Sequence, residues 1–188
     1  MSVVGKTLNQ FPLIKGTIAL VGNAKSILLK DWGEEIDSHD IVIRFGDAKI
    51  ESFEKQVGKK EDFRFICFPS GKNGFEETLS DKKIFLMAGD HFTLLEGVRR
   101  LVNRNQIYFI APSFRKYCNE MTGKMSSLGL MAILGFLDHK PDLYGFDFFK
   151  TLHYHQELIT DPHKYHNWDK EKEIVQDLHN EGLVNWKQ

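Results

Sequence analysis

Short apolar runs recur along this 188-residue chain, and they constrain its fold more than any other feature. Most of them are continuous rather than alternating in hydrophobicity, which is typical of strands that are buried on both faces of a parallel sheet. The pattern predicts six strands, at Thr17 to Val21, Asp40 to Phe45, Phe63 to Phe68, Lys83 to Ala88, Gln106 to Ala111 and Asp142 to Gly145.

Stretches with helical spacing of apolar residues accompany these runs, and they predict helices at Phe92 to Asn103, Ser113 to Met121, Leu128 to His139 and Asp169 to Glu181. Asn167 is placed to cap the last helix, and Gly182 is placed to end it. Buried strands combined with helices predict an α/β fold with a doubly wound, Rossmann-like, mostly parallel sheet and helices on both faces. The length fits a single domain over residues 1–188.

The first predicted strand ends at Gly22 and Asn23, where the backbone must turn. Ligands in open α/β sheets collect at such strand ends. Gly22 allows another group to approach the backbone closely, and the Asn23 amide can both donate and accept hydrogen bonds, which suits a phosphate and a ribose. No further glycines follow at dinucleotide-fold spacing and no GxxxxGK[ST] is present, so the chain has neither an NAD fingerprint nor a P-loop.

Four segments, in chain order, carry short motifs of one kind. The residues VGN, EIDSHD and IVIR, at 21–23, 35–40 and 41–44, are similar to motif L of the sialylmotifs, which the sialyltransferase family shares. Ser126 to Ile133 together with Asp142 to Phe146 resemble motif S, and His153-Tyr154-His155 resembles motif III. His166 and Glu171 fit the HxxxxE of motif VS. The chain is therefore identified as a short, divergent relative of the glycosyltransferase family 29 type.

This resemblance implies an inverting glycosyltransferase with a GT-A-variant fold. It would transfer a sialic acid or a related keto-sugar acid from a CMP-activated donor to a hydroxyl group of a glycan or glycolipid. Such an attack requires a base with a near-neutral pKa, which histidine supplies. The resemblance implies that His166 is this base and that His153 stabilises the departing CMP phosphate. Glu171 would orient the His166 ring or cap the structure, unless it is an exposed helix residue.

Donor contacts are expected at Gly22, Asn23, Ser127, Gly129, Gly145 and Tyr154. Ser127 and Gly129 begin a predicted helix, so they could meet an anion there, but Ser127 could equally be an ordinary N-cap. The alternative for Tyr154 and His155 is a purely structural role. The alternative for Phe146 is burial in the hydrophobic core.

The chain departs from the family pattern at several positions. Ile18 stands where motif L usually has a cysteine, and no partner cysteine occurs between Leu137 and Lys140, so the family disulfide is absent. Gly46 and Leu128 replace an Asn and a Thr of the family motifs, which leaves the identity of the donor open. Acceptor recognition cannot be carried over.

Composition excludes some partners. The formal net charge of −1 gives no reason to expect a nucleic-acid partner. The two cysteines make no disulfide framework, and no apolar run is long enough for a membrane anchor, so we expect a cytoplasmic protein of bacterial or viral origin. The chain has no Asp-x-Asp, and a CMP donor has a single phosphate, so no metal or other cofactor is expected.

Two rival interpretations stay open. Four histidines, with Glu157 or Asp161 nearby, could form the metal site of a hydrolase: His153, His155, His163 and His166. The replacements Gly46 and Leu128 favour instead a catalytically idle module that only binds CMP.

Overall fold

The computed structural model describes residues 15–67, 83–87, 106–155 and 164–188. Within them, seven strands form one sheet in which every neighbouring pair is parallel. The strand order is β5-β4-β3-β2-β1-β6-β7. The strands are β1 (Ile18–Val21), β2 (Ile41–Phe45), β3 (Phe63–Cys67), β4 (Lys83–Met87), β5 (Gln106–Phe109), β6 (Asp142–Tyr144) and β7 (Asn185–Trp186). All six predicted strands are confirmed.

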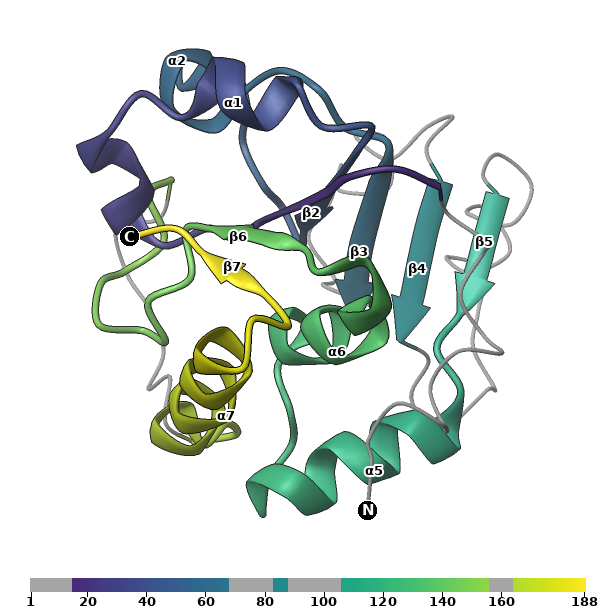
Figure 1. Ribbon diagram of the computed structural model, residues 1–188. Coiled ribbons are helices and arrows are strands. Elements are labelled where there is room, and N and C mark those ends of the chain that lie inside the picture. Colours follow the sequence, from purple (N-terminus) through teal and green to yellow (C-terminus); the bar gives the residue numbers. More distant parts are fainter. Residues whose placement is uncertain (1–14, 68–82, 88–105, 156–163) are drawn as a thin grey trace.

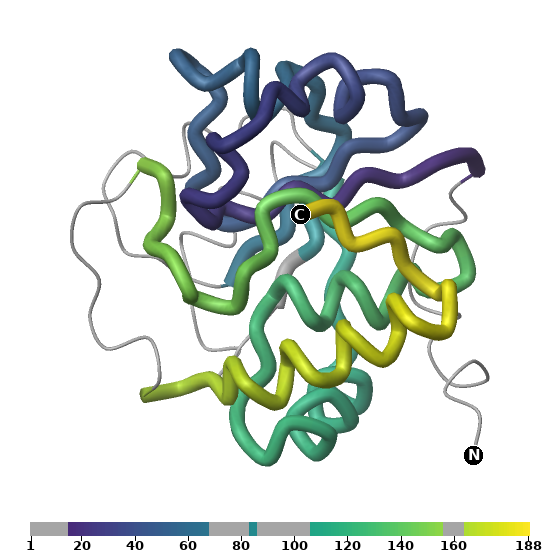
Figure 2. The backbone as a smooth tube through the Cα atoms, turned by 60° about the vertical axis from the view of Figure 1, so that its left-hand side comes forward, coloured from purple at the N-terminus to yellow at the C-terminus, as the bar shows by residue number. Residues whose placement is uncertain are grey.

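Helices cover both faces of the sheet, as the buried strand pattern predicts (Figures 1 and 2). One face carries the short helices η2 (Lys25–Leu29), α1 (Gly33–Asp37) and α2 (Glu54–Val57). The other face carries α5 (Pro112–Thr122), α6 (Leu128–Gly135), η3 (Leu137–His139) and α7 (Trp168–Asn180). The doubly wound α/β prediction is therefore confirmed.

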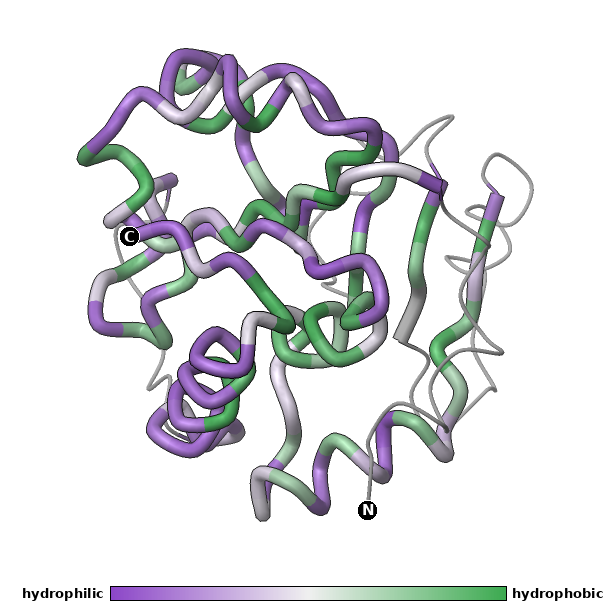
Figure 3. The backbone as a smooth tube through the Cα atoms, viewed as in Figure 1, coloured by the Kyte–Doolittle hydropathy of each residue, from purple (hydrophilic) through white to green (hydrophobic). Residues whose placement is uncertain are grey.

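Successive residues of β1 contribute to two separate cores, because side chains of a strand alternate between its faces. Ile18 and Leu20 belong to the larger core, which also holds most of α6. Ala19 and Val21 belong to the smaller core under η2 and α1. Figure 3 shows α6 as hydrophobic along most of its length, in agreement with its complete burial from Leu130 to Gly135.

Three of the four predicted helices lie in the described residues and are confirmed. The Asn167 side chain accepts a hydrogen bond from the Lys170 N–H at 3.3 Å and caps α7, and Gly182 follows the helix with φ +70°. The predicted helix from Leu128 to His139 is split at Phe136 into α6 and η3. The predicted helix Phe92 to Asn103 lies outside the described residues.

The strand order reverses direction around β1, which has β2 on one side and β6 on the other. Val21 is in register with Tyr144, and the Gly22 N–H donates to the Tyr144 carbonyl at 2.7 Å. The carboxyl ends of β1 and β6 therefore lie side by side. This is the topological switch point, where ligands bind in open α/β sheets.

Candidate functional site

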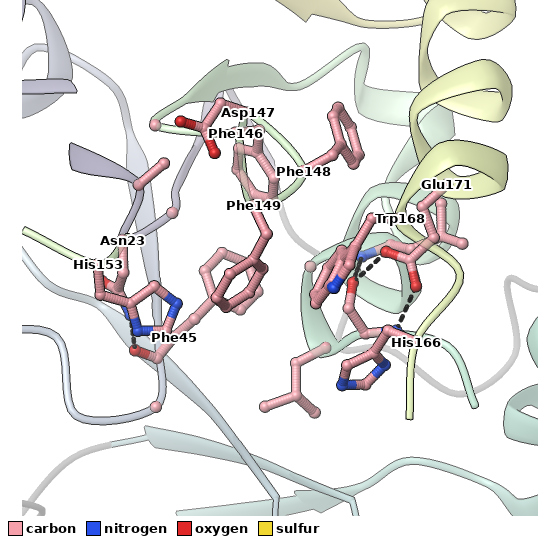
Figure 4. A pocket seen from close by; sticks show the side chains of 18 of the residues that line it. Asn23, Phe45, Phe146, Asp147, Phe148, Phe149, His153, His166, Trp168 and Glu171 are labelled. Carbon is pink, nitrogen blue, oxygen red and sulfur yellow. Dashed lines mark hydrogen bonds between the residues drawn. The ribbon is translucent and has the colours of Figure 1, made fainter. Parts of the chain in front are cut away.

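A pocket of about 370 Å³ opens at this switch point (Figure 4). Its walls come from the segments after β1, β2 and β6, from the start of α6, and from the residues around the start of α7. Of the eight site residues predicted from the sequence, seven line it: Gly22, Asn23, Ser127, Gly129, Gly145, His153 and His166. Tyr154 does not. The fold therefore brings these seven residues together from four of the five segments, all but the one after β2.

Gly22 and Gly145 allow the backbones at the ends of β1 and β6 to lie in close contact. A Cβ on Gly22 would lie 2.5 Å from the Gly145 carbonyl oxygen, and a Cβ on Gly145 would lie 2.7 Å from the Gly22 carbonyl oxygen. Gly145 also has φ +67°, in the left-handed region that favours glycine. The close approach predicted at Gly22 is thus made by the backbone at the end of β6.

Asn23 is 9% exposed, and its amide group faces two ways. The Nδ2 group donates to the Phe45 carbonyl at 3.0 Å, which fixes the side chain against the end of β2. The Oδ1 atom is buried and has no hydrogen-bond partner among the described residues. Because Asn23 lines the pocket, this oxygen is an acceptor that a ligand can use.

The backbone around His153 is held against the turn that follows β1. The Lys25 N–H donates to the Leu152 carbonyl at 2.7 Å, and the Tyr154 N–H donates to the Asn23 carbonyl at 3.0 Å. His153 is therefore presented to the pocket on the same wall as Asn23.

The side chains that follow His153 have structural partners. Tyr154 is buried in the smaller core, and its hydroxyl donates to the Lys49 carbonyl at 2.5 Å. His155 pairs with Asp47 at 3.1 Å. For Tyr154 the structure favours the structural alternative over a donor contact, because its ring packs against Phe53 and its hydroxyl is already bonded outside the pocket.

Ser127 is the N-cap of α6, and its polar groups are already satisfied inside the protein. Its hydroxyl accepts from the Leu130 N–H at 3.0 Å and donates to Glu171 Oε2 at 2.6 Å, and its own N–H donates to Glu171 Oε1 at 2.8 Å. The hydroxyl thus has the N-cap role, and because Ser127 also lines the pocket, its contact with the donor stays a prediction. The Leu128 and Gly129 N–H groups belong to the first turn, which has no intrahelical acceptors, and both residues line the pocket.

Glu171 is fully buried and acts as a cap for the start of α6. The alternative of an exposed helix residue is wrong, and the carboxylate accepts hydrogen bonds from Ser127 rather than orienting the His166 ring. Burial is the main reason that the pKa of Glu171 is raised to about 7, against the opposing effect of the two Ser127 bonds. This carboxyl therefore titrates near neutrality.

We expect Glu171 to make the stability of the protein fall between about pH 4.5 and pH 7. Its pKa is higher in the folded than in the unfolded chain, so the folded chain binds the proton more tightly and loses stability as the pH rises through this range. Glu171→Gln cannot ionise and should gain about 3 kcal/mol relative to the native chain between pH 5 and pH 8. Urea unfolding at a series of pH values measures this.

The matched control is Glu173→Gln, because Glu173 lies on the same helix but has a side chain that is 60% exposed. It should follow the pH profile of the native chain. Identical dependence of the unfolding free energy on pH in Glu171→Gln and in the native chain would contradict a raised pKa of Glu171.

His166 has the geometry of a base. Its Nδ1 lies 2.8 Å from the Met125 carbonyl oxygen, which can only accept, so Nδ1 carries the proton and Nε2 carries the lone pair. Desolvation lowers the pKa of the ring below the usual value of histidine, against the opposing effect of the Met125 carbonyl. The ring also packs on Trp168, with centroids 4.7 Å apart. His166 is thus neutral at pH 7 and can accept a proton.

The aromatic rings of Phe149 and Trp168 lie between the walls that carry His153 and His166 (Figure 4). Phe149 lies 5.1 Å from His153 and 4.5 Å from Trp168 between ring centroids. Phe148 and Phe149 both have positive φ, of 56° and 60°, which is a strained conformation for residues with a side chain. Such strain is stored where the surroundings fix it, and here it places Phe149 between His153 and Trp168.

Sequence reasoning missed Phe149, Trp168 and Asp147 as pocket residues. Trp168 lies inside the HxxxxE segment, and Asp147 is a polar residue just after a predicted strand end. Both positions could therefore have been predicted as pocket residues. The left-handed backbone that presents Phe149 has no sequence signature, because the residue is not glycine.

The hydrolase interpretation finds no support in the described part of the chain. In residues 15–67, 83–87, 106–155 and 164–188, no three histidine, cysteine, aspartate or glutamate side chains are grouped to hold a metal ion. His163, Glu157 and Asp161, which that interpretation needs, lie outside the described residues. Across the same ranges, no helix has the length and apolar character to span a membrane.

Comparison with known proteins gives one family. Residues 15–88 match glycosyltransferase family 29 (sialyltransferase). A β-1,6-galactosyltransferase of Arabidopsis thaliana is 50% identical over 48 residues, which are 26% of this chain and 12% of the relative. A β-galactosamide α-2,3-sialyltransferase of Gallus gallus is 28% identical over 158 residues, which are 73% of this chain and 46% of the relative. The chain thus spans less than half of the length of each of these two relatives.

The fold agrees with the sequence match. A crystal structure of a mammalian sialyltransferase superimposes with a TM-score of 0.70 at 21% identity, over 92% of this chain and 68% of that one. A second one, solved with Gal-β-1-3GalNAc-ortho-nitrophenol, gives a TM-score of 0.69 at 21% identity, over 91% of this chain and 68% of that one. Residues 15–88 thus resemble glycosyltransferase family 29 (sialyltransferase), and over most of the chain the fold is that of the two sialyltransferase structures.

Proposed function

We propose that this chain is an inverting glycosyltransferase that transfers a sialic acid or a related keto-sugar acid from a CMP-activated donor to a hydroxyl of a glycan or glycolipid. The observation that carries the proposal is the pocket at the ends of β1 and β6, which holds His166 on one wall and His153 on the other. The match to the family model does not by itself fix the donor, because one relative is named as a galactosyltransferase.

The proposed reaction is a single displacement. Nε2 of His166 takes the proton of the acceptor hydroxyl as its oxygen attacks the anomeric carbon of the donor sugar. The bond from that carbon to the phosphate oxygen breaks, and CMP leaves with the electron pair. His153 donates a hydrogen bond or a proton to the departing phosphate, where negative charge develops. The Gly129 N–H and the turn at Gly22 and Asn23 line the same pocket and are proposed to hold the donor.

We also propose that the reaction needs no metal, because the single phosphate of a CMP donor does not call for a divalent ion across two phosphates. A cytoplasmic setting stays a prediction. The relatives named above come from a plant and a bird, and they give no support to the bacterial or viral origin that the sequence suggested.

The test is CMP release from CMP-sialic acid and from CMP-Kdo, with EDTA present and with the native chain. We expect release from one of the two donors, increased by a glycan acceptor with a terminal hydroxyl. Release only after a divalent ion is added would contradict the metal-independent mechanism. No release from either donor, together with measurable CMP binding, would favour the idle CMP-binding module.

A further inference from the structure

Asp147 is a pocket residue to which neither the sequence motifs nor the proposed mechanism gives a role. It lies two residues beyond Gly145, in the segment that follows β6. Its Oδ2 atom accepts three hydrogen bonds, from the Ser26 hydroxyl at 3.0 Å, the Thr151 N–H at 3.1 Å and the Thr151 hydroxyl at 2.5 Å. This oxygen ties η2, after β1, to the segment after β6.

The second oxygen of the same carboxylate has no such role. Asp147 Oδ1 is buried and has no hydrogen-bond partner among the described residues. A carboxylate oxygen accepts hydrogen bonds strongly, and leaving one buried without a donor is unfavourable. An unsatisfied acceptor at the edge of a pocket therefore points to a ligand that brings the missing N–H or O–H.

Asn23 Oδ1 is a second buried acceptor without a partner in the described part of the chain. Figure 4 shows Asn23 and Asp147 on the side of the pocket that also carries His153, away from His166 and Glu171. Two acceptors on one wall suit a ligand that presents two neighbouring hydroxyl groups. In doubly wound folds, a carboxylate at a strand end is a known means of binding the hydroxyls of a ribose.

We infer that Asp147 binds a ribose hydroxyl of the CMP donor and makes the site selective for ribonucleotides over deoxyribonucleotides. This inference rests on the proposed function, because it assumes that the pocket binds a cytidine nucleotide. With Asp147 and Asn23 on one side of the pocket, the ribose would lie against the ends of β1 and β6, and the phosphate and the sugar acid would point toward the histidines.

The test compares the dissociation constants of CMP, 2′-deoxy-CMP and 3′-deoxy-CMP by calorimetry. The native chain should bind at least one of the deoxy compounds about tenfold or more weakly than CMP, as expected for a lost hydrogen bond to a charged group. Asp147→Asn should reduce that preference to below about threefold. The amide oxygen of the asparagine can still accept the hydrogen bonds from Ser26 and Thr151. Its NH₂ group replaces the free oxygen Oδ1, so it cannot accept a hydrogen bond from a ribose hydroxyl.

Ser26→Ala is the matched control, because it removes one bond to Oδ2 and does not change the oxygen that lacks a partner. It should keep the preference for CMP over the deoxy compounds. Equal binding of all three nucleotides by the native chain, or a preference that survives in Asp147→Asn, would overturn the inference while leaving the proposed function intact.

Two other outcomes are informative. A native chain that rejects UMP, and accepts it after Asp147→Asn, without distinguishing the deoxy compounds, would assign the carboxylate to the cytosine amino group and overturn the ribose assignment. No binding of CMP at all would instead overturn the proposed function. Even if Asp147→Asn does not fold, equal binding of CMP and the two deoxy compounds by the native chain would overturn the inference.

Discussion

Replacing His166 by alanine is expected to lower the rate of sugar transfer by about two to four orders of magnitude, the usual contribution of a general base. In the native chain, the hydrogen bond from Nδ1 to the Met125 carbonyl leaves the lone pair on Nε2. Alanine has no group that can take the proton of the attacking hydroxyl. CMP affinity should change little, because His166 lies on the wall away from Asn23 and His153. Steady-state CMP release and CMP calorimetry measure the two effects separately.

His139→Ala is the matched control, since His139 lies in η3 and does not line the pocket. It should transfer at the native rate. In the native chain, the acid limb of the kcat/KM profile should lie below the usual pKa of histidine, because burial lowers the pKa of His166. A near-native rate for His166→Ala would remove it from the mechanism.

Gly145→Ala is expected to lower the free energy of unfolding by about 2 to 5 kcal/mol. A left-handed backbone at a non-glycine residue contributes about 1 to 2 kcal/mol of this, and overpacking contributes about 1 to 3 kcal/mol. The overpacking arises because the new Cβ would lie 2.7 Å from the Gly22 carbonyl oxygen and 3.2 Å from Ile27. Urea unfolding followed by circular dichroism measures the loss.

Gly123→Ala isolates the conformational part of this loss. Gly123 ends α5 with φ +70°, and apart from its neighbours in the chain no described residue has an atom within 4 Å of the position of its Cβ. It should therefore lose only about 1 to 2 kcal/mol. Equal losses in the two variants would show that the approach of Gly22 and Gly145 does not limit the packing of the strand ends.

The strands and long helices could be predicted because continuous apolar runs and helical spacing are local properties of a sequence. The runs at β1 and β2 are buried on both faces, as their composition indicates. The two-residue strand β7 could not be predicted, since its place in the sheet depends on pairing with β6 and not on its own pattern. The short helices α1 and α2 have too few turns to show a period.

The site could be predicted in part from motifs, and the remainder depends on contacts between distant residues. The motifs predicted the location of His153 and His166 in one pocket, together with the strand ends at Gly22 and Gly145. They did not predict that Glu171 would be buried against Ser127, because those residues are 44 positions apart and meet only when α7 packs beside α6. The unsatisfied oxygen of Asp147 likewise follows from tertiary packing.

Titration of the native chain with CMP shows whether the pocket between β1 and β6 binds the nucleotide of a CMP-activated donor. Trp168 lines this pocket, whereas Trp32 and Trp186 do not, so tryptophan emission can report on the site. We predict a saturable change in emission with EDTA present, and its loss in Trp168→Phe. No saturable change, or the same change in Trp168→Phe, would mean that CMP does not bind in this pocket.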